Sequence, residues 1–293
     1  MTPTSNDPPV RLLVLGANLT RMRDLWGVSR GHIAAAARVS ADALADWESG
    51  RAAPPPWGLQ RLMRLYRLPP ETQRVLAQWA KEASDPRTRH ALLDTGPAWE
   101  DRLAALELAA VRVRAFSDYT VPTAVRSSTY AQNLEQMRSG TPLGLTDPER
   151  RPRPVVTGPH SWEHIDVILH ASVLTRPFGS EPGNLHPLAD QLAYLCKVAR
   201  DRLADIRITP VGAGHGVQAE GSDLLGLTMP CPHRSTVWVQ TTSGSATYLN
   251  GPHGQEHQRT FEELSSRAAD LPLSAVLLHK AADACMTRVA GER

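Results

Sequence analysis

Residues 15–54 of this 293-residue chain read LGANLTRMRDLWGVSRGHIAAAARVSADALADWESGRAAP, and this stretch decides the fold of the N-terminal part. Apolar side chains recur three or four residues apart over residues 12–26, which predicts one face of a helix that ends at Gly27. The same periodicity predicts two later helices, about 57–67 and 70–83, each introduced by prolines.

Two shorter helices are predicted inside the quoted stretch. Ser29 and Ser40 are good N-caps, and they precede helices expected at about 29–37 and 40–49. Two short capped helices separated by a few residues are the local signature of a helix-turn-helix, in which a small residue such as Ala34 allows close packing. A small helical bundle with no role in DNA binding is the alternative interpretation of the same pattern.

The stretch Leu15–Pro54 resembles Xre-family helix-turn-helix domains throughout, and its most specific part is Trp47–Arg51 followed by Pro54. Three later segments resemble the domain of unknown function that often follows such a domain in actinobacterial regulators: Ala115–Leu134, Ile168–Gly179 and Ile206–Gly216. The resemblance implies a transcription regulator, often paired with a small partner protein, and it implies nothing firm about a ligand.

The resemblance also implies which residues face DNA, because the second helix of the pair enters the major groove in this family. The implied positions are Arg30, Arg38, Ser40, Ala41, Asp42, Ala45, Asp46 and Arg51. The chain departs from the family pattern here, since its recognition helix SADALADWES has no Lys, Arg, Gln or Asn. Asp42 and Asp46 are unexpected near phosphates, Glu48 is interpreted as structural, and Arg38 replaces the usual turn glycine.

The remaining segments mix helices and strands, with three antiparallel strands expected late in the chain and two helices at its end. We therefore expect a multi-domain chain, in which an all-α five-helix helix-turn-helix domain is followed by an α+β domain. The expected divisions are a disordered tail (1–9), the helix-turn-helix domain (10–83), a linker (84–100) and the α+β domain (101–293).

Composition narrows the class of protein. The formal net charge is only +2, so any basic surface must be local, and residues 1–80 do hold ten arginines against six acidic residues. Three widely spaced cysteines form no disulfide framework, which favours a reducing cytoplasm. The apolar stretches are too short for a membrane span, and no cofactor-binding or catalytic motif is present, so no cofactor is expected.

Histidines supply the only hints of a metal site. The segments Gly158–His164 and Gly251–His257 both contain H-x-x-E-H, a spacing that can bind zinc when it lies on a helix. The weak candidate ligands are His160, His164, His253 and His257. Both copies follow Gly-Pro and neither lies clearly inside a long helix, so partly exposed loop or helix-start histidines are the favoured interpretation and no metal is assigned.

Two further histidines are candidates for binding a ligand in the α+β domain. His170 ends a predicted strand, and His215 follows a glycine-rich turn after another predicted strand. Loops at the ends of strands often carry function. A hydrogen-bonded histidine with a structural role is the alternative at both positions.

The sequence thus favours a cytoplasmic, homodimeric, sequence-specific DNA-binding regulator whose second domain binds a small-molecule effector or a protein. Its rival is a helix-turn-helix scaffold that no longer binds DNA and that binds or transforms a small molecule, an enzyme for which the sequence nominates no mechanism beyond acid/base work by His170 or His215. The acidic recognition helix is the feature that separates the two hypotheses. A protein-interaction adaptor for one small partner is a third possibility.

Overall fold

A computed structural model describes residues 7–139, 162–176, 184–210, 223–230, 232, 234–242 and 244–291 of the chain. It divides into two compact units, each made of two stretches of sequence. The first unit comprises Met1–Arg112 and Leu225–Gln258, and the second comprises Val113–Leu224 and Arg259–Arg293. The first unit therefore extends well beyond the predicted helix-turn-helix helices.

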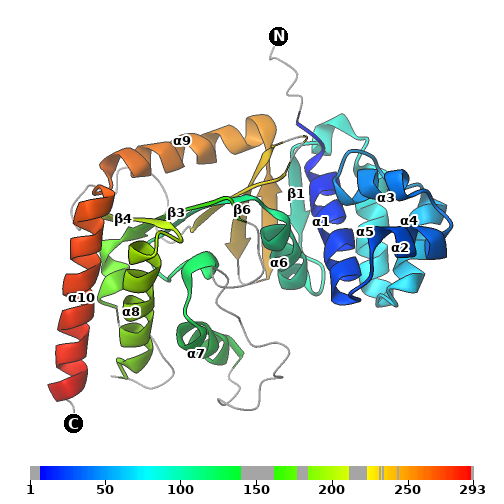
Figure 1. Ribbon diagram of the computed structural model, residues 1–293. Coiled ribbons are helices and arrows are strands. Elements are labelled where there is room, and N and C mark those ends of the chain that lie inside the picture. Colours follow the sequence, from blue (N-terminus) through cyan, green and yellow to red (C-terminus); the bar gives the residue numbers. More distant parts are fainter. Residues whose placement is uncertain are drawn as a thin grey trace. The chain divides into compact units, whose positions relative to one another are not determined.

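Five helices open the first unit and gather into one cluster (Figure 1). They are α1 (Val10–Leu25), α2 (Arg30–Ala37), α3 (Ala41–Glu48), α4 (Pro56–Leu65) and α5 (Pro70–Glu82). The predicted caps form, because the Ser29 hydroxyl accepts from the His32 N–H at 3.3 Å and the Ser40 hydroxyl accepts from the Ala43 N–H at 3.1 Å. The five predicted helices are therefore confirmed, with boundaries within two residues of expectation.

Close packing of α1 on α3 depends on Gly16. A Cβ atom at this position would lie 2.5 Å from the carbonyl oxygen of Glu48 and 2.6 Å from that of Trp47. Only glycine allows two backbones to approach this closely. The contact buries Leu13, Leu44 and the Trp47 ring, which form part of the core of the cluster.

The turn between α2 and α3 requires a left-handed residue. Arg38 has φ 55° and ψ 48°, a conformation in which its N–H can bond back to the carbonyl of Ala35 and close the helix. A non-glycine residue in this region costs on the order of 1 kcal/mol. Arg38, which stands where the family usually has glycine, therefore lowers the stability of this turn.

Besides the start of α9 (Gly251–Arg267), the first unit contains four strands and a sixth helix: β1 (Ala91–Asp94), α6 (Trp99–Ala109), β5 (Leu224–Thr228), β6 (Thr236–Thr242) and β7 (Ser245–Leu249). The strands lie in the order β1-β7-β6-β5. Each neighbouring pair is antiparallel, with Leu92 opposite Tyr248 and Val239 opposite both Leu225 and Tyr248. The predicted run of three late antiparallel strands is thus confirmed.

The predicted linker over 84–100 is wrong for much of its length. It contains a 3₁₀ turn (Pro86–Thr88), β1 and the start of α6. Asp94 and Arg102 form a buried ion pair with side chains 1% and 2% exposed, joined at 2.6 Å and 2.8 Å. The Arg102 guanidinium also lies 5.4 Å from the centre of the Trp79 ring on α5. A four-residue strand carries too little periodicity to be recognised from sequence.

The end of the predicted disordered tail is also ordered. The Pro8 carbonyl accepts from the Asn250 side-chain amide at 2.9 Å, and the Asp7 carbonyl accepts from Arg89 at 2.8 Å. Residues 1–6 lie outside the described residues. The contacts of residues 7 and 8 are made with positions more than 80 residues away, so no local pattern could indicate them.

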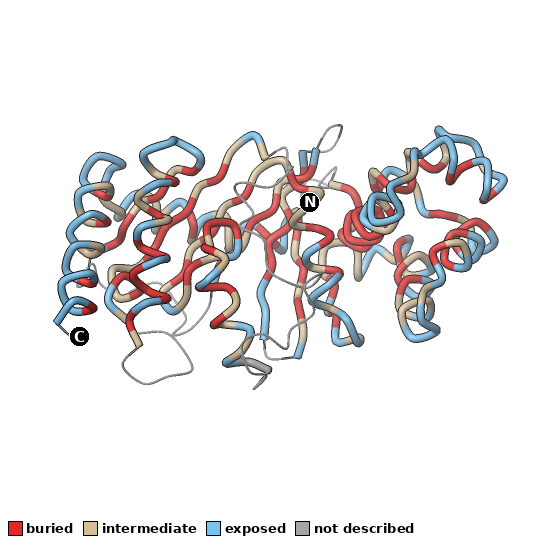
Figure 2. The backbone as a smooth tube through the Cα atoms, turned by 60° about the horizontal axis from the view of Figure 1, so that its bottom comes forward, coloured by how far each residue is buried: buried red, intermediate tan, exposed pale blue. Residues whose placement is uncertain are grey.

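The second unit contains strands β2 (Arg112–Ser117), β3 (His164–His170) and β4 (Asp205–Thr209), in the order β2-β3-β4. Its helices are α7 (Ser128–Ser139), α8 (His186–Arg200), the end of α9 (Gly251–Arg267) and α10 (Leu271–Gly291). Strands β3 and β4 are parallel, and α10 packs on both α8 and β4. Figure 2 shows α10, which leads to the C-terminus, largely exposed on its outer side.

The observed order, helices first and then mixed strands and helices, confirms the predicted fold class of an all-α region followed by an α+β region. The segment Leu106–Ser117 contains the end of α6 and the whole of β2. No helix within the described ranges is long and apolar enough to cross a membrane.

Candidate nucleic-acid interface

The residues predicted to contact DNA lie on the surface of α2, α3 and the loop after α3. One face of α3 packs against the other helices of the cluster, and its buried residues are Leu44, Trp47 and Glu48. The opposite face is exposed at Ser40, Ala41 and Asp42 and half-exposed at Ala45 and Asp46, while Arg30, Arg38 and Arg51 are exposed around it. The arrangement leaves α3 accessible, as a recognition helix must be.

Glu48 is the centre of a buried charge network. Its side chain is 2% exposed and accepts from Arg23 Nε at 2.7 Å and from Arg30 Nε at 2.7 Å. This contact agrees with the structural role expected for Glu48. The Arg30 side chain remains 47% exposed, and its ion pair with the buried Glu48 carboxylate holds it in position.

The two acidic residues on α3 have different surroundings. Asp46 pairs with Arg51 at 2.5 Å, and each side chain is between 40% and 50% exposed, so the charge of Arg51 is offset beside α3. Asp42 lies in the first turn of α3, where a carboxylate interacts favourably with the helix dipole. The exposed side of α3 is therefore neutral to acidic.

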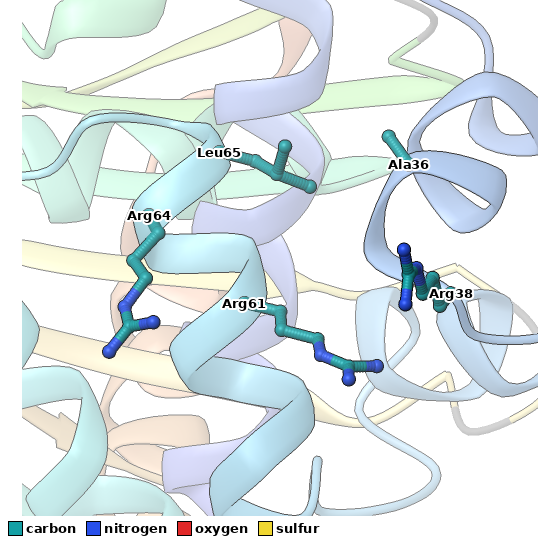
Figure 3. Close-up of a pocket in the computed structure, with 5 residues that line it drawn as sticks. All are labelled: Ala36, Arg38, Arg61, Arg64 and Leu65. Carbon is teal, nitrogen blue, oxygen red and sulfur yellow. The ribbon is translucent and has the colours of Figure 1, made fainter.

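A basic depression of about 410 Å³ lies between α2 and α4, lined by Ala36, Arg38, Arg61, Arg64 and Leu65. Figure 3 shows Arg61 reaching from α4 toward the end of α2, where Arg38 lies, and Arg64 leaving α4 on another side. No carboxylate lines the depression, and these arginines form no ion pair with any residue that the structure describes. It is a site that attracts anions.

Arg61 is held in place by two contacts. Its guanidinium donates to the carbonyl of Ala37 at 3.3 Å, at the C-terminal end of α2, and lies 5.2 Å from the centre of the Trp57 ring. Both contacts leave donors of the guanidinium available. Sequence reasoning missed Arg61 and Arg64. Nothing local showed that α4 packs close to Arg38.

The candidate ligand residue His170 caps a short helix. Its ring Nδ1 lies 2.7 Å from the Ser172 hydroxyl and accepts from the Ser172 N–H at 3.3 Å, at the start of a 3₁₀ helix (Ala171–Leu174). These bonds match the structural alternative considered for His170, and a ligand role remains a prediction. His215, the other candidate, lies outside the described residues.

The two H-x-x-E-H segments differ in structure. The second copy lies in the first two turns of α9, which is one of the two placements, loop or helix start, favoured from the sequence. There the ring of His253 stacks on that of His90 at 6.1 Å, and the ring of His257 lies 6.3 Å from that of Trp238. Burial lowers the pKa of His257. The two histidines thus contact different aromatic rings.

The first copy is described only at its end. His164 begins strand β3, where its ring Nε2 lies 2.9 Å from Asp166 and 3.4 Å from Asp205. His160, its expected companion, lies outside the described residues. The two aspartates were not predicted as companions of His164, although Asp166 follows it at the two-residue spacing that places side chains on one face of a strand.

Comparison with family models gives two matches along the chain. A model described as a helix-turn-helix domain matches residues 14–76, and a model described as a domain of unknown function (DUF5753) matches residues 101–280. Neither the curated proteins nor the solved structures provide a match. The first match covers most of α1, helices α2 to α4 and part of α5, which include the exposed helix α3 and the basic depression.

Proposed function

Since this chain belongs to the family that carries the domain of unknown function DUF5753, with a helix-turn-helix domain before it, we propose that it is a sequence-specific DNA-binding transcription regulator. In this proposal α3 enters the major groove with Ser40, Ala41 and Ala45 against base edges. Asp42 accepts a hydrogen bond from the amino group of a cytosine.

The observation that carries the proposal is an exposed α3 together with a basic depression that no carboxylate offsets. Phosphate neutralisation supplies much of the affinity of proteins for DNA. Arg38, Arg61 and Arg64 supply this charge, and Arg30, oriented by Glu48, adds one phosphate contact. Because α3 offers few base-reading donors, we expect strong salt dependence and moderate discrimination between sequences.

The finer parts of the proposal follow from how such domains read DNA. A homodimer would place two recognition helices one turn of the duplex apart on a two-fold operator. The DUF5753 region would respond to a metabolite or to a small partner protein, and the protein would act in the cytoplasm. Membership of the Xre type, and an actinobacterial origin, remain predictions from the residues quoted above.

The test is fluorescence anisotropy of the full chain on DNA fragments from its own genomic neighbourhood, titrated with salt. We expect site-selective binding that weakens steeply with salt, and a loss of affinity in Arg30→Ala/Arg51→Ala and in Arg61→Ala/Arg64→Ala. Arg74→Ala is the matched control, since Arg74 lies on α5 with its side chain 78% exposed. Weak binding that ignores sequence and is equal in all variants would contradict the proposal.

One observation favours the rival, a scaffold that no longer binds DNA. The basic groups nearest to α3 are already engaged, because Arg51 pairs with Asp46 and Arg30 pairs with Glu48. If site-selective binding fails, a search for small molecules that raise the melting temperature of the protein becomes the next measurement. Recovery of one stoichiometric small protein without DNA would instead favour an adaptor.

A further inference from the structure

Three metal-ligating side chains meet at the start of strands β3 and β4. His164 and Asp166 are two residues apart on β3 and so share one face of the strand, and Asp166 lies directly opposite Asp205 on the parallel strand β4. His164 Nε2 lies 2.9 Å from a carboxylate oxygen of Asp166 and 3.4 Å from one of Asp205. One ligand atom from each of the three residues lies within 4.8 Å of the other two.

We propose that His164, Asp166 and Asp205 bind a divalent transition-metal ion, with Zn²⁺ as the best fit and solvent completing the coordination. Zinc bonds of about 2.0–2.1 Å in tetrahedral geometry separate neighbouring ligand atoms by roughly 3.3 Å. The two distances from the imidazole nitrogen bracket this value. Three protein ligands with an open fourth position are typical of zinc sites that exchange ligands.

The charges at the site favour a cation. Asp166 and Asp205 are cross-strand neighbours, and like charges in this relation destabilise a sheet. The nearest basic residue on the same face of β4, Arg207, donates instead to the carbonyl of Ser265 at 3.4 Å. A doubly charged ion between the carboxylates would offset both of them, which the imidazole alone cannot do.

The ligand types select the class of metal. An imidazole nitrogen suits Zn²⁺, Co²⁺ and Ni²⁺, whereas Mg²⁺ and Ca²⁺ prefer sites made of oxygen alone. The side chains are 36%, 17% and 41% exposed for His164, Asp166 and Asp205, so the ion would be reachable from solvent. The strand register fixes the carboxylates on a rigid support, which favours binding without rearrangement.

The main rival is a plain ion pair, in which a protonated His164 bridges the two carboxylates. The two hypotheses predict opposite effects of Asp205→Asn, which removes one charge without changing shape. In the metal-free protein, loss of carboxylate repulsion should raise the melting temperature if the site is built for a cation. If the site is an ion pair, the same change removes an attraction and should lower it.

The experiment uses the full chain, freed of metal with a chelator and titrated with Co²⁺ and then Zn²⁺. We expect the chain to bind one Co²⁺ with the visible absorption of a low-symmetry site, and Zn²⁺ to displace it. In His164→Gln and in Asp205→Asn the affinity for the metal should be at least about 100-fold lower. The matched controls are His253→Gln/His257→Gln and Asp201→Asn, which should bind as the parent chain does.

Circular dichroism of each variant checks folding, and Asp166→Asn provides a second test if one variant fails to fold. Binding that is absent, or unchanged in all three ligand variants, would overturn the proposal, as would a loss confined to the His253→Gln/His257→Gln control. The result is independent of DNA binding, because all three ligands lie in the second unit. A failure of the regulator hypothesis therefore leaves this site untouched.

Discussion

Two arginine clusters in the first unit differ in what their charges do. Arg23 and Arg30 converge on the buried carboxylate of Glu48. Arg38, Arg61 and Arg64 surround a depression that no carboxylate lines. The first cluster connects α1, α2 and α3 and serves the fold, whereas the second, on the α2–α3 turn and α4, has positive charge available for an anion.

The uncompensated positive charge therefore lies away from α3, the helix expected to read DNA. The basic groups closest to α3 are engaged by Glu48 or Asp46. Affinity for a polyanion must then come chiefly from the α2–α4 side, with α3 contributing shape and a few polar contacts. Substitutions in the two clusters should therefore separate stability from DNA binding.

The largest expected effect is on stability. Glu48→Ala leaves two partly buried guanidinium groups without their carboxylate, and we expect the free energy of unfolding to fall by about 2–3 kcal/mol. Urea denaturation followed by circular dichroism measures it. Asp46→Ala is the control, because its exposed pair with Arg51 should contribute under about 1 kcal/mol. Equal losses in the two variants would show that the Glu48 network is not a structural centre.

The second effect should appear in DNA binding. Arg61→Ala/Arg64→Ala removes two cations, so we expect a loss of affinity of about tenfold or more and a salt slope reduced by about two. Stability should fall by less than about 1.5 kcal/mol, from the bond to Ala37 and the Trp57 contact. Anisotropy at several salt concentrations gives the slope. An unchanged slope would exclude these arginines as phosphate contacts.

A smaller effect with opposite signs is expected at the turn. Arg38→Gly relieves a left-handed backbone and should raise stability by about 1 kcal/mol while weakening DNA binding several-fold. Arg67, which has φ 51° and lies outside the depression, provides the control. Arg67→Gly should give the same gain in thermal stability and leave DNA binding as it was. If Arg38→Gly raised both the thermal stability and the DNA affinity, Arg38 would not be a phosphate contact.

The smallest expected effect concerns the pair beside α3. Asp46→Asn removes the carboxylate that offsets Arg51, and we expect DNA affinity to rise a few-fold at low salt, an effect that fades as salt screens it. Unfolding free energy should change by less than about 0.5 kcal/mol. A decrease in affinity for one cytosine-containing site alone would show instead that Asp46 reads a base.

Short-range features of the first unit could be predicted because their causes are local. The hydroxyls of Ser29 and Ser40 bond within three residues, so the starts of α2 and α3 follow from sequence. The strand β1 and the ion pair between Asp94 and Arg102 could not be predicted in the same way. A short strand exists only because β7, more than 150 residues later, offers it a partner.

The candidate sites follow the same division. The surface of α3 was predicted because helical periodicity separates its buried Leu44 and Trp47 from its exposed residues. The meeting of Arg38 with Arg61, and of His164 with Asp205, depends on how helices pack and how strands align. Neither packing nor register is encoded in the spacing of nearby residues.

The sequence by itself determined the five helices, the serine caps of α2 and α3, the late antiparallel strands and the exposed face of α3, because each depends on periodicity or on bonds within one turn. Only the tertiary structure decided which charges are offset and which are available, and which histidine lies beside carboxylates. Charge and coordination act over a few ångströms in space, and residues far apart in the chain reach those distances only after the fold has formed.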